Sequence, residues 1–310
     1  MDSVSLQNLV EVHFRRCGRC KHLPQLGRLP NLKSLAIWRL PELEYIESDH
    51  SSTFELESIE LDYSSTSTAS FPSLLRLEIR HCENLKDMPP TPYLEDLILK
   101  KVNQKLINQI FGLNKLKSTD ISQMEFLDCF AEECLQSLTS LECLVISECP
   151  RLTSFSHGMQ HLSNLVHLSF SNCEELDLSK DESDNIFDLQ GLKSLRSVDI
   201  HGVPKLASLP QWLLQASNLE HLSIKKCLNL KALPEEIKAL QSLQQLEIIR
   251  CPSLTSLPEG MQGFASLSQL KIAGCPELEE RCKEDAGEDW YKIKRIPHIT
   301  HKLEYYERHL

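Results

Sequence analysis

Leucine and isoleucine recur along this chain at fixed intervals, with polar residues between them. In the clearest stretch, hexapeptides of the form Leu-x-x-Leu-x-Ile open at Leu219, Leu243 and Leu267, one every 24 residues. The Leu-x-Ile alternation has a period of two and predicts a short strand with one buried face. A later Leu-x-x-Leu-Pro element, such as Leu254–Pro258, turns the chain back. Because proline suits a first helical turn, we expect a short helical or 3-10 segment after it.

The same pattern extends over most of the chain and predicts about twelve units. The array is regular over residues 141–275 and irregular over residues 1–140, and the unit at Leu116 is degenerate because Thr119 replaces an aliphatic residue. One such unit cannot bury its own apolar face and needs neighbours. The predicted fold is therefore an α/β solenoid (a horseshoe) over residues 1–275, with a parallel concave sheet and short helical, 3-10 or irregular convex segments. The units open at Leu9, Leu32, Leu56, Leu74, Leu94, Leu116, Leu141, Leu165, Leu195, Leu219, Leu243 and Leu267.

The two ends of the predicted array differ. Residues 276–310 carry apolar residues at Trp290, Ile293, Ile296 and Ile299, and we interpret them as a cap with a tail. The pattern already begins near Leu6, with no matching cap, so we expect the first unit to stack on preceding chain.

Seven of the twelve cysteines occupy one position of the repeat, just after the strand. We expect these thiols to point inward and donate weak hydrogen bonds to backbone carbonyls, without disulfides, in a reducing compartment. Cys17-Gly-Arg-Cys20, with two histidines nearby, resembles a zinc motif, but Cys17 already fills the repeat position and we expect no metal site. The seven are Cys17, Cys82, Cys149, Cys173, Cys227, Cys251 and Cys275.

The units that begin Cys-Pro-x-Leu resemble a known family. Cys251-Pro-Ser-Leu-Thr-Ser-Leu-Pro258 is similar to the leucine-rich repeats of plant nucleotide-binding immune receptors of the coiled-coil class. The ending, with Cys275-Pro-Glu-Leu-Glu-Glu-Arg-Cys282, Gly287-Glu-Asp-Trp290 and Ile296-Pro-His-Ile299, resembles the C-terminus of that family more specifically.

This resemblance implies a cytoplasmic or nucleocytoplasmic receptor. Its repeats would sense an effector of a pathogen or pest, or a guarded host protein, and would hold the receptor's own nucleotide-binding module inactive. The chain has no Gly-x-x-x-x-Gly-Lys-Ser/Thr phosphate loop, so we expect no cofactor here and nucleotide only in a separate upstream module.

Composition narrows the partner class. The formal net charge of −11 argues against nucleic acid, which requires clustered cations. No apolar run approaches the 18 or so residues of a membrane span, and the first residues do not form a secretory signal. A protein partner is the expectation that remains.

The strand positions between the leucines should face the partner, because solenoids bind through their concave surface. The N-terminal units are rich there in charge and in aromatic residues, which are enriched at binding hot spots, and we expect the main contacts on them. The candidate residues are His13, Arg15, Arg16, Trp38, Arg39, Asp62, Tyr63, Arg76, Glu78, Arg80, His81, Lys100, Lys101, Lys225, Lys226 and Arg250.

Other functions stay open at this stage. We find no nucleophile, base and orienting group that the repeat would bring together, so catalysis is not expected. An adaptor, such as the substrate-recognition part of a ubiquitin ligase, or a GTPase-activating repeat protein would share the fold. Residues 44–55, 62–70 and 177–191 interrupt the pattern, and each is either a functional loop or a tolerated insertion.

Overall fold

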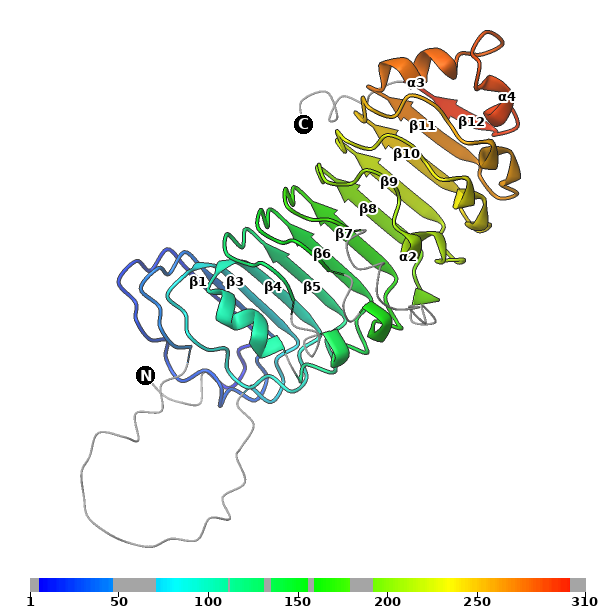
Figure 1. Cartoon of the computed structure of the whole chain (residues 1–310). Helices are drawn as coiled ribbons and strands as arrows, with labels where there is room; N and C mark the ends of the chain where they lie inside the picture. Colours follow the sequence, from blue (N-terminus) through cyan, green and yellow to red (C-terminus); the bar gives the residue numbers. More distant parts are fainter. Residues whose placement is uncertain are drawn as a thin grey trace, which may run out of the picture. The chain divides into compact units, whose positions relative to one another are not determined.

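The computed structural model describes residues 6–46, 71–110, 112–130, 135–155, 159–178 and 192–301. The chain divides into two units, Met1–Thr119 and Asp120–Leu310. The described residues contain twelve strands, β1 to β12, whose order in the sheet is their order in the chain (Figure 1). The predicted α/β solenoid of stacked turns with a parallel sheet is therefore confirmed.

The first unit carries four parallel strands in exact register. They are β1 (Glu11–Arg15), β2 (Ser34–Trp38), β3 (Arg76–Cys82) and β4 (Asp96–Val102). A 3-10 helix, η2 (Gln104–Ile110), follows β4. The repeat expected to open at Leu56 lies outside the described residues. Among the described residues, β2 pairs directly with β3.

The second unit continues the pattern with shorter, more uniform strands. Strand β5 begins at the boundary between the units, and β12 follows the last repeat. The strands are β5 (Ser118–Ser122), β6 (Cys143–Ser147), β7 (His167–Ser171), β8 (Ser197–His201), β9 (His221–Lys225), β10 (Gln245–Ile249), β11 (Gln269–Ala273) and β12 (His298–Thr300).

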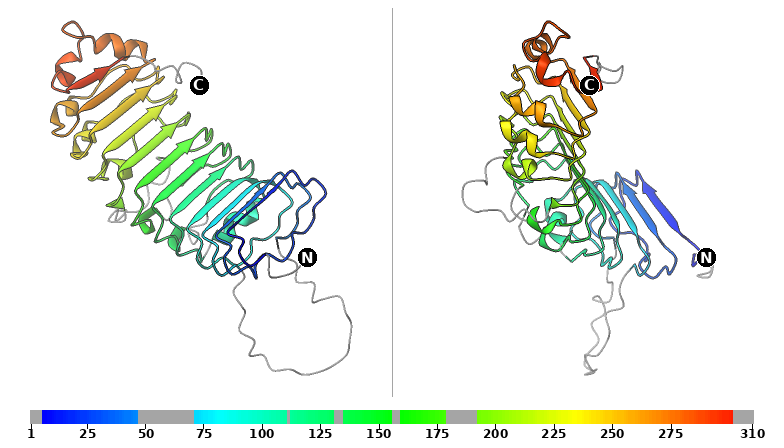
Figure 2. Two further views of the ribbon diagram at one scale, coloured as in Figure 1. Left: turned by 180° about the vertical axis from the view of Figure 1, so that it is seen from behind. Right: turned by 90° about the vertical axis from the view of Figure 1, so that its right-hand side faces the viewer.

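Short helical segments in the second unit lie on the side away from the strands, as the right-hand view of Figure 2 shows. Three of them begin directly after the proline of a Leu-Pro element, because proline supplies the helical φ and needs no N–H partner there. The prediction of short turns, not long helices, is confirmed. The segments are η3 (Met159–His161), α2 (Gln211–Leu214), η5 (Glu235–Ala239) and η6 (Glu259–Gly263).

Strands in the middle of the second unit, β6, β7 and β8, bury alternate residues, which explains why the leucine pattern produces this fold. In β7, for example, Leu168 and Phe170 are fully buried, while His167, Ser169 and Ser171 remain partly exposed on the other face. Transfer of such side chains from water contributes about 1.5–3 kcal/mol each. We call the partly exposed side the strand face. The degenerate unit at Leu116 obeys the same rule, since Thr119 takes the inward position and is 1% exposed.

The repeat cysteines fill the position under the turn, as predicted. Cys82 donates from Sγ to the carbonyl of Arg80 at 3.4 Å and lies 3.8 Å from the carbonyl of Ile37 on the preceding strand. Cys251 repeats this arrangement, and none of the described cysteines is in a disulfide. Cys17 differs from the other six because it is exposed.

The residue before the inward turn adopts a left-handed conformation in unit after unit. In the first unit, φ is 57° at Arg16, 59° at Arg39, 54° at His81 and 50° at Lys101. The second unit has glycine at two of the equivalent positions: φ is 60° at Gly202 and 72° at Gly274. This kink ends each strand and sends the next residue into the core.

Residues after β11 form a compact end to the second unit. Helices α3 (Pro276–Arg281) and α4 (Trp290–Ile293) precede β12, which pairs in parallel with β11. Ile293 is fully buried, whereas Trp290, Ile296 and Ile299 are half-buried. The polar residue Asp289, 0% exposed, lies at the centre of this segment and was not singled out by the sequence pattern.

Candidate functional site

One row of side chains crosses the strand face of the first unit near the ends of its strands. The parallel register places Arg15 beside Trp38, Trp38 beside Arg80, and Arg80 beside Lys100. The four residues come from four different repeats but hold the same repeat position. In a parallel sheet with no register shift, equivalent positions must form such a row, about 4.8 Å from strand to strand.

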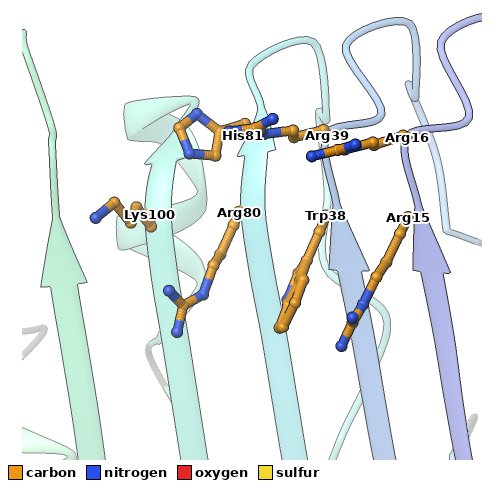
Figure 3. Close-up of a pocket in the computed structure, with 7 residues that line it drawn as sticks. All are labelled: Arg15, Arg16, Trp38, Arg39, Arg80, His81 and Lys100. Atoms are coloured by element: carbon orange, nitrogen blue, oxygen red, sulfur yellow. The ribbon is translucent and has the colours of Figure 1, made fainter.

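The indole of Trp38 lies between two guanidinium groups. The Arg15 guanidinium carbon is 3.9 Å from the centre of the indole, and that of Arg80 is 5.5 Å from it. Figure 3 shows the three side chains side by side, all reaching in the same direction along the strands. We call these three residues the stack. Cation–π attraction of this kind contributes about 0.5–1 kcal/mol per pair at a partly exposed site.

A second row lies one residue further along, at the left-handed positions. Arg16, Arg39 and His81 belong to it, and they line a cavity of about 550 Å³ together with the stack and Lys100. The kink after each strand explains why consecutive residues, such as Arg15 and Arg16, contribute to the same cavity. We call these seven residues the basic pocket. All seven were candidates from the sequence, and the structure brings them together.

The basic pocket is strongly cationic. None of its seven lining residues is acidic, and five carry a permanent positive charge. Partial burial lowers the pKa of His81 below its ordinary value, and the nearby positive charges of Arg39, Lys101 and Lys100 lower it further. A protonated His81 would add a sixth positive charge to the pocket and would be repelled by the other five. The neutral imidazole is therefore favoured.

Two carboxylates act on the arginines of the stack, Glu78 from the neighbouring row and Glu11 from the row beyond it. Glu78, 8% exposed, forms an ion pair with the Nε of Arg80. Glu11 accepts a hydrogen bond of 2.7 Å from Nε2 of His13. The other ring nitrogen of His13, Nδ1, lies 3.1 Å from the guanidinium Nη2 of Arg15. These contacts orient the two arginines without occupying all of their N–H donors, since each guanidinium has five.

Trp38 retains an unused donor as well. Its indole Nε1 is buried and has no hydrogen-bond acceptor among the described residues. A buried N–H without a partner is uncommon and costs about 1–3 kcal/mol. Ala36, two residues earlier on the same face, is 3% exposed, so the larger side chains around it cover its methyl group. A small residue at this position leaves room for the indole.

The remaining candidates of the first unit do not line the basic pocket. Lys101 forms an exposed ion pair of 3.5 Å with Glu83, and Arg76 is an exposed residue at the start of β3. Asp62 and Tyr63 lie outside the described residues. Sequence reasoning named these positions from the repeat alone, and the repeat does not reveal which side chains converge.

The second unit carries a different set of charges on its strand face. Lys225 forms an ion pair of 2.8 Å with Glu247, and Glu247 also accepts from Ser223 at 3.3 Å. Lys226 and Arg250 occupy left-handed positions near His201. Burial and these three cations lower the pKa of His201. Here one cation, Lys225, is paired with a carboxylate of the adjacent strand.

The candidate metal motif is not assembled. Cys17 and Cys20 each donate to a nearby backbone carbonyl, those of Arg15 and His22. Over the described ranges, no three His, Cys, Asp or Glu side chains lie close enough together to hold a metal ion. No helix in those ranges is long and apolar enough to cross a membrane.

Comparison with known sequences matches this chain to plant proteins. Residues 131–276 match the family described as plant disease resistance protein RPS2-like, leucine-rich repeats, and residues 1–40 match the R13L1/DRL21 leucine-rich repeats. These two ranges are therefore similar to the leucine-rich repeats of plant disease-resistance proteins. Domains of this type typically act as non-enzymatic scaffolds for protein interaction.

Individual relatives agree with this assignment. Disease resistance protein RGA2 of Solanum bulbocastanum is 31% identical over 159 residues, which are 49% of this chain and 15% of RGA2. Putative disease resistance RPP13-like protein 1 of Arabidopsis thaliana is 28% identical over 233 residues, which are 67% of this chain and 20% of that protein. The chain thus spans a fifth or less of the length of these relatives.

Solved structures share the fold at low sequence identity. The leucine-rich-repeat domain of the type III effector XopL has a TM-score of 0.54 at 20% identity, and the match covers 67% of this chain and 71% of that domain. TLR13, in a complex with ssRNA13, has a TM-score of 0.52 at 18% identity over 98% of this chain and 53% of that protein.

Proposed function

We propose that this chain is the ligand-recognition and autoregulatory domain of an intracellular plant immune receptor located in the cytoplasm. It binds a protein, either an effector from a pathogen or pest or a host protein that the receptor guards, through its strand face. The same domain contacts the receptor's nucleotide-binding module and restrains it. We assign no catalysis, cofactor or nucleotide to this chain.

The single observation that carries the proposal is the basic pocket on the strand face of the first unit. Trp and Arg dominate the energetic centres of protein interfaces, because each combines a large contact area with directed polar groups. Here they lie together in a partly exposed row rather than scattered singly over the surface. The disease-resistance type of the repeats supports a role in immune recognition.

Charge reversal at the pocket tests the proposal. We expect the triple substitution Arg15→Glu, Arg80→Glu and Lys100→Glu to weaken binding to the protein partner by about tenfold or more, because the contact would change from attraction to repulsion. Purified domain would be screened against candidate effectors by biolayer interferometry, with circular dichroism to confirm folding. Unchanged binding of a folded triple variant would exclude the pocket as the recognition surface.

Autoregulation requires a separate readout in the receptor. The same substitutions, introduced into a full-length receptor that carries this domain, should raise cell-death signalling in leaf tissue without an effector if the face also holds the nucleotide-binding module. A receptor that stays silent without its effector and loses its response to it would limit the face to recognition.

A further inference from the structure

We propose that the basic pocket binds an acidic peptide segment, with the stack holding its carboxylates. This inference rests on the proposed function, because it names the chemistry that a protein partner presents to the same surface. It adds a ligand class, a binding mode and the residues that determine specificity.

The stack prepares two guanidinium groups for oxyanions. A guanidinium that lies over an indole uses its flat face, whereas its N–H donors point outward in its own plane. Arg15 and Arg80 therefore remain able to donate to carboxylate oxygens while Trp38 holds them in place (Figure 3). Side chains that are already ordered lose less entropy on binding, which raises affinity without additional contacts.

Trp38 itself offers the third feature of the site. Its buried Nε1–H has no acceptor among the described residues, although guanidinium groups flank the ring on either side. A ligand oxygen can accept from this donor only when the side chains that cover the Nε1 atom move aside, and the hydrogen bond then removes a desolvation cost that the unbound protein carries. A cation or an apolar ligand would leave the donor unsatisfied.

The layout of the pocket favours an extended ligand over a single small anion. From Arg15 on β1 to Lys100 on β4, the row crosses three strand spacings, about 14 Å. Arg16 and Arg39 add a second basic row beside the first. One phosphate group is too small to contact both ends, whereas a peptide with several carboxylates would. The indole also offers apolar surface, which a peptide side chain would cover and an inorganic polyphosphate would not.

Charge balance points in the same direction. The chain has a net charge of −11, yet none of the residues that line this cavity is acidic. On the strand face of the second unit, Lys225 is neutralised by Glu247 at 2.8 Å, and in the first unit Glu78 pairs with Arg80 in the same way. An acidic peptide would supply negative charge beside the remaining cations that line the basic pocket.

Binding of a defined peptide by the full chain tests this inference. The probe is a fluorescein-labelled peptide of about ten alternating aspartate and glutamate residues, followed by fluorescence anisotropy, with an alternating serine–glycine peptide as the neutral control. We expect binding to the acidic peptide alone, with affinity falling as salt is added, since exposed charges are screened. Arg16→Ala combined with Arg39→Ala should weaken it about tenfold.

The matched control removes the same charge from another surface of the same unit. Arg28 and Lys33 are exposed and belong to the repeat that contains Trp38, but they do not line the pocket. Arg28→Ala combined with Lys33→Ala should leave the affinity within about twofold, since only general electrostatics change. Equal losses in the two double variants would overturn the inference.

Two further measurements separate the possible outcomes. Trp38→Phe keeps an aromatic ring but removes the Nε1–H, and we expect a smaller loss than for Trp38→Ala. If pyrophosphate displaces the peptide at a concentration below the peptide's own dissociation constant, the pocket is a site for small phosphoryl groups and the inference is wrong. If the protein partner binds through the pocket but the acidic peptide does not, the inference fails and the proposed function stands.

Discussion

The carboxylate of Asp289 accepts a hydrogen bond of 2.9 Å from the backbone N–H of Leu257, a residue 32 positions earlier in the chain. Arg281 donates two more bonds to the same carboxylate, at 3.1 and 3.2 Å, and Lys292 forms an ion pair with it at 2.9 Å. Asp289 therefore joins the residues after β11 to the last repeats. A single buried side chain closes the end of the second unit.

The first prediction concerns Asp289→Asn. We expect it to lower the free energy of unfolding by about 3 kcal/mol, because an amide of the same shape removes the buried counter-charge of Lys292 and leaves it only the exposed Glu259, 3.3 Å away. Amide hydrogen exchange should rise first in α4 and β12. Glu288→Gln removes the exposed neighbouring carboxylate that pairs with Arg281 and should change stability by less than about 1 kcal/mol.

The effect of Asp289 should depend on pH. Burial would raise the pKa of this carboxyl, but the bonds from Arg281, the Leu257 N–H and Lys292 outweigh it and hold the pKa below its ordinary value. A depressed folded-state pKa contributes stability above the unfolded value, about 3.9, and this contribution is lost as pH falls through the folded-state value. Urea unfolding at pH 7 and below pH 4 or so should show the gap between wild type and Asp289→Asn closing in acid. A gap that persists unchanged would contradict the ionic role.

The second prediction is that most cysteines of the native chain resist thiol reagents. The thiolate is the reactive form, and burial raises the pKa of Cys82 to about 11. Burial and the nearby Asp289 carboxylate raise the pKa of Cys282 to about 12. Titration with Ellman's reagent before and after denaturation should show seven protected thiols among the described residues, with Cys17 and Cys129 reacting first. The seven are Cys82, Cys149, Cys173, Cys227, Cys251, Cys275 and Cys282.

Rapid reaction of the whole set in the native state would mean that the repeats open on the timescale of the assay. Cys251→Ala provides the control, because it should lower the count of protected thiols by one and destabilise the chain by a cavity term of about 1 kcal/mol.

The repeat made the fold predictable from the sequence. It did not predict how the side chains of the basic pocket pack against one another. The spacing of Leu219, Leu243 and Leu267 fixes strand, turn and register together, since each unit must place its leucines against those of the next. The seven residues of the basic pocket were among the strand-face candidates that the repeat suggested, and their role in binding stays a prediction.

Side-chain packing explains what the repeat left open. The stack depends on the small size of Ala36, on the ion pair between Glu78 and Arg80, and on the conformations that Arg15 and Trp38 adopt together. None of these appears in a pattern of apolar positions. Asp289 escaped notice for a similar reason, because an acidic residue in a charged segment predicts exposure, and only the fold supplies the three partners that allow its burial.

The third prediction separates stability from function at Arg39. Its φ of 59° lies in the left-handed region, which costs a non-glycine residue about 1–2 kcal/mol. Arg39→Gly should therefore keep or raise the free energy of unfolding, by about 0.5 kcal/mol after the entropic cost of glycine, while weakening binding of the acidic peptide. Arg76→Gly makes the same chemical change in the extended strand β3 and should destabilise the chain by about 0.5–1 kcal/mol. Equal destabilisation by the two variants in urea titrations would show that the left-handed strain at Arg39 is negligible.

The fourth prediction uses His81 as a reporter of the pocket's charge. Burial, followed by the positive charges of Arg39, Lys101 and Lys100, lowers the pKa of its imidazole, so its titration should centre below the ordinary value of about 6.5. Because the folded state then resists protonation more than the unfolded chain does, this residue contributes stability above that value and loses it as pH falls through the folded-state pKa.

Removal of one neighbouring charge should move this titration upward. Arg39→Gln takes away a repulsive cation and should raise the pKa of His81, and the acidic peptide should raise it further by adding negative charge. The measurement is a proton–nitrogen NMR titration of the histidine rings, with the His81 signals assigned by comparison with His81→Gln. Arg28→Gln, which removes an exposed cation that does not line the pocket, should leave the His81 midpoint unchanged. If neither Arg39→Gln nor the peptide moves the midpoint, the positive charges do not act together on the imidazole, and the electrostatic basis for acidic-peptide binding would be lost.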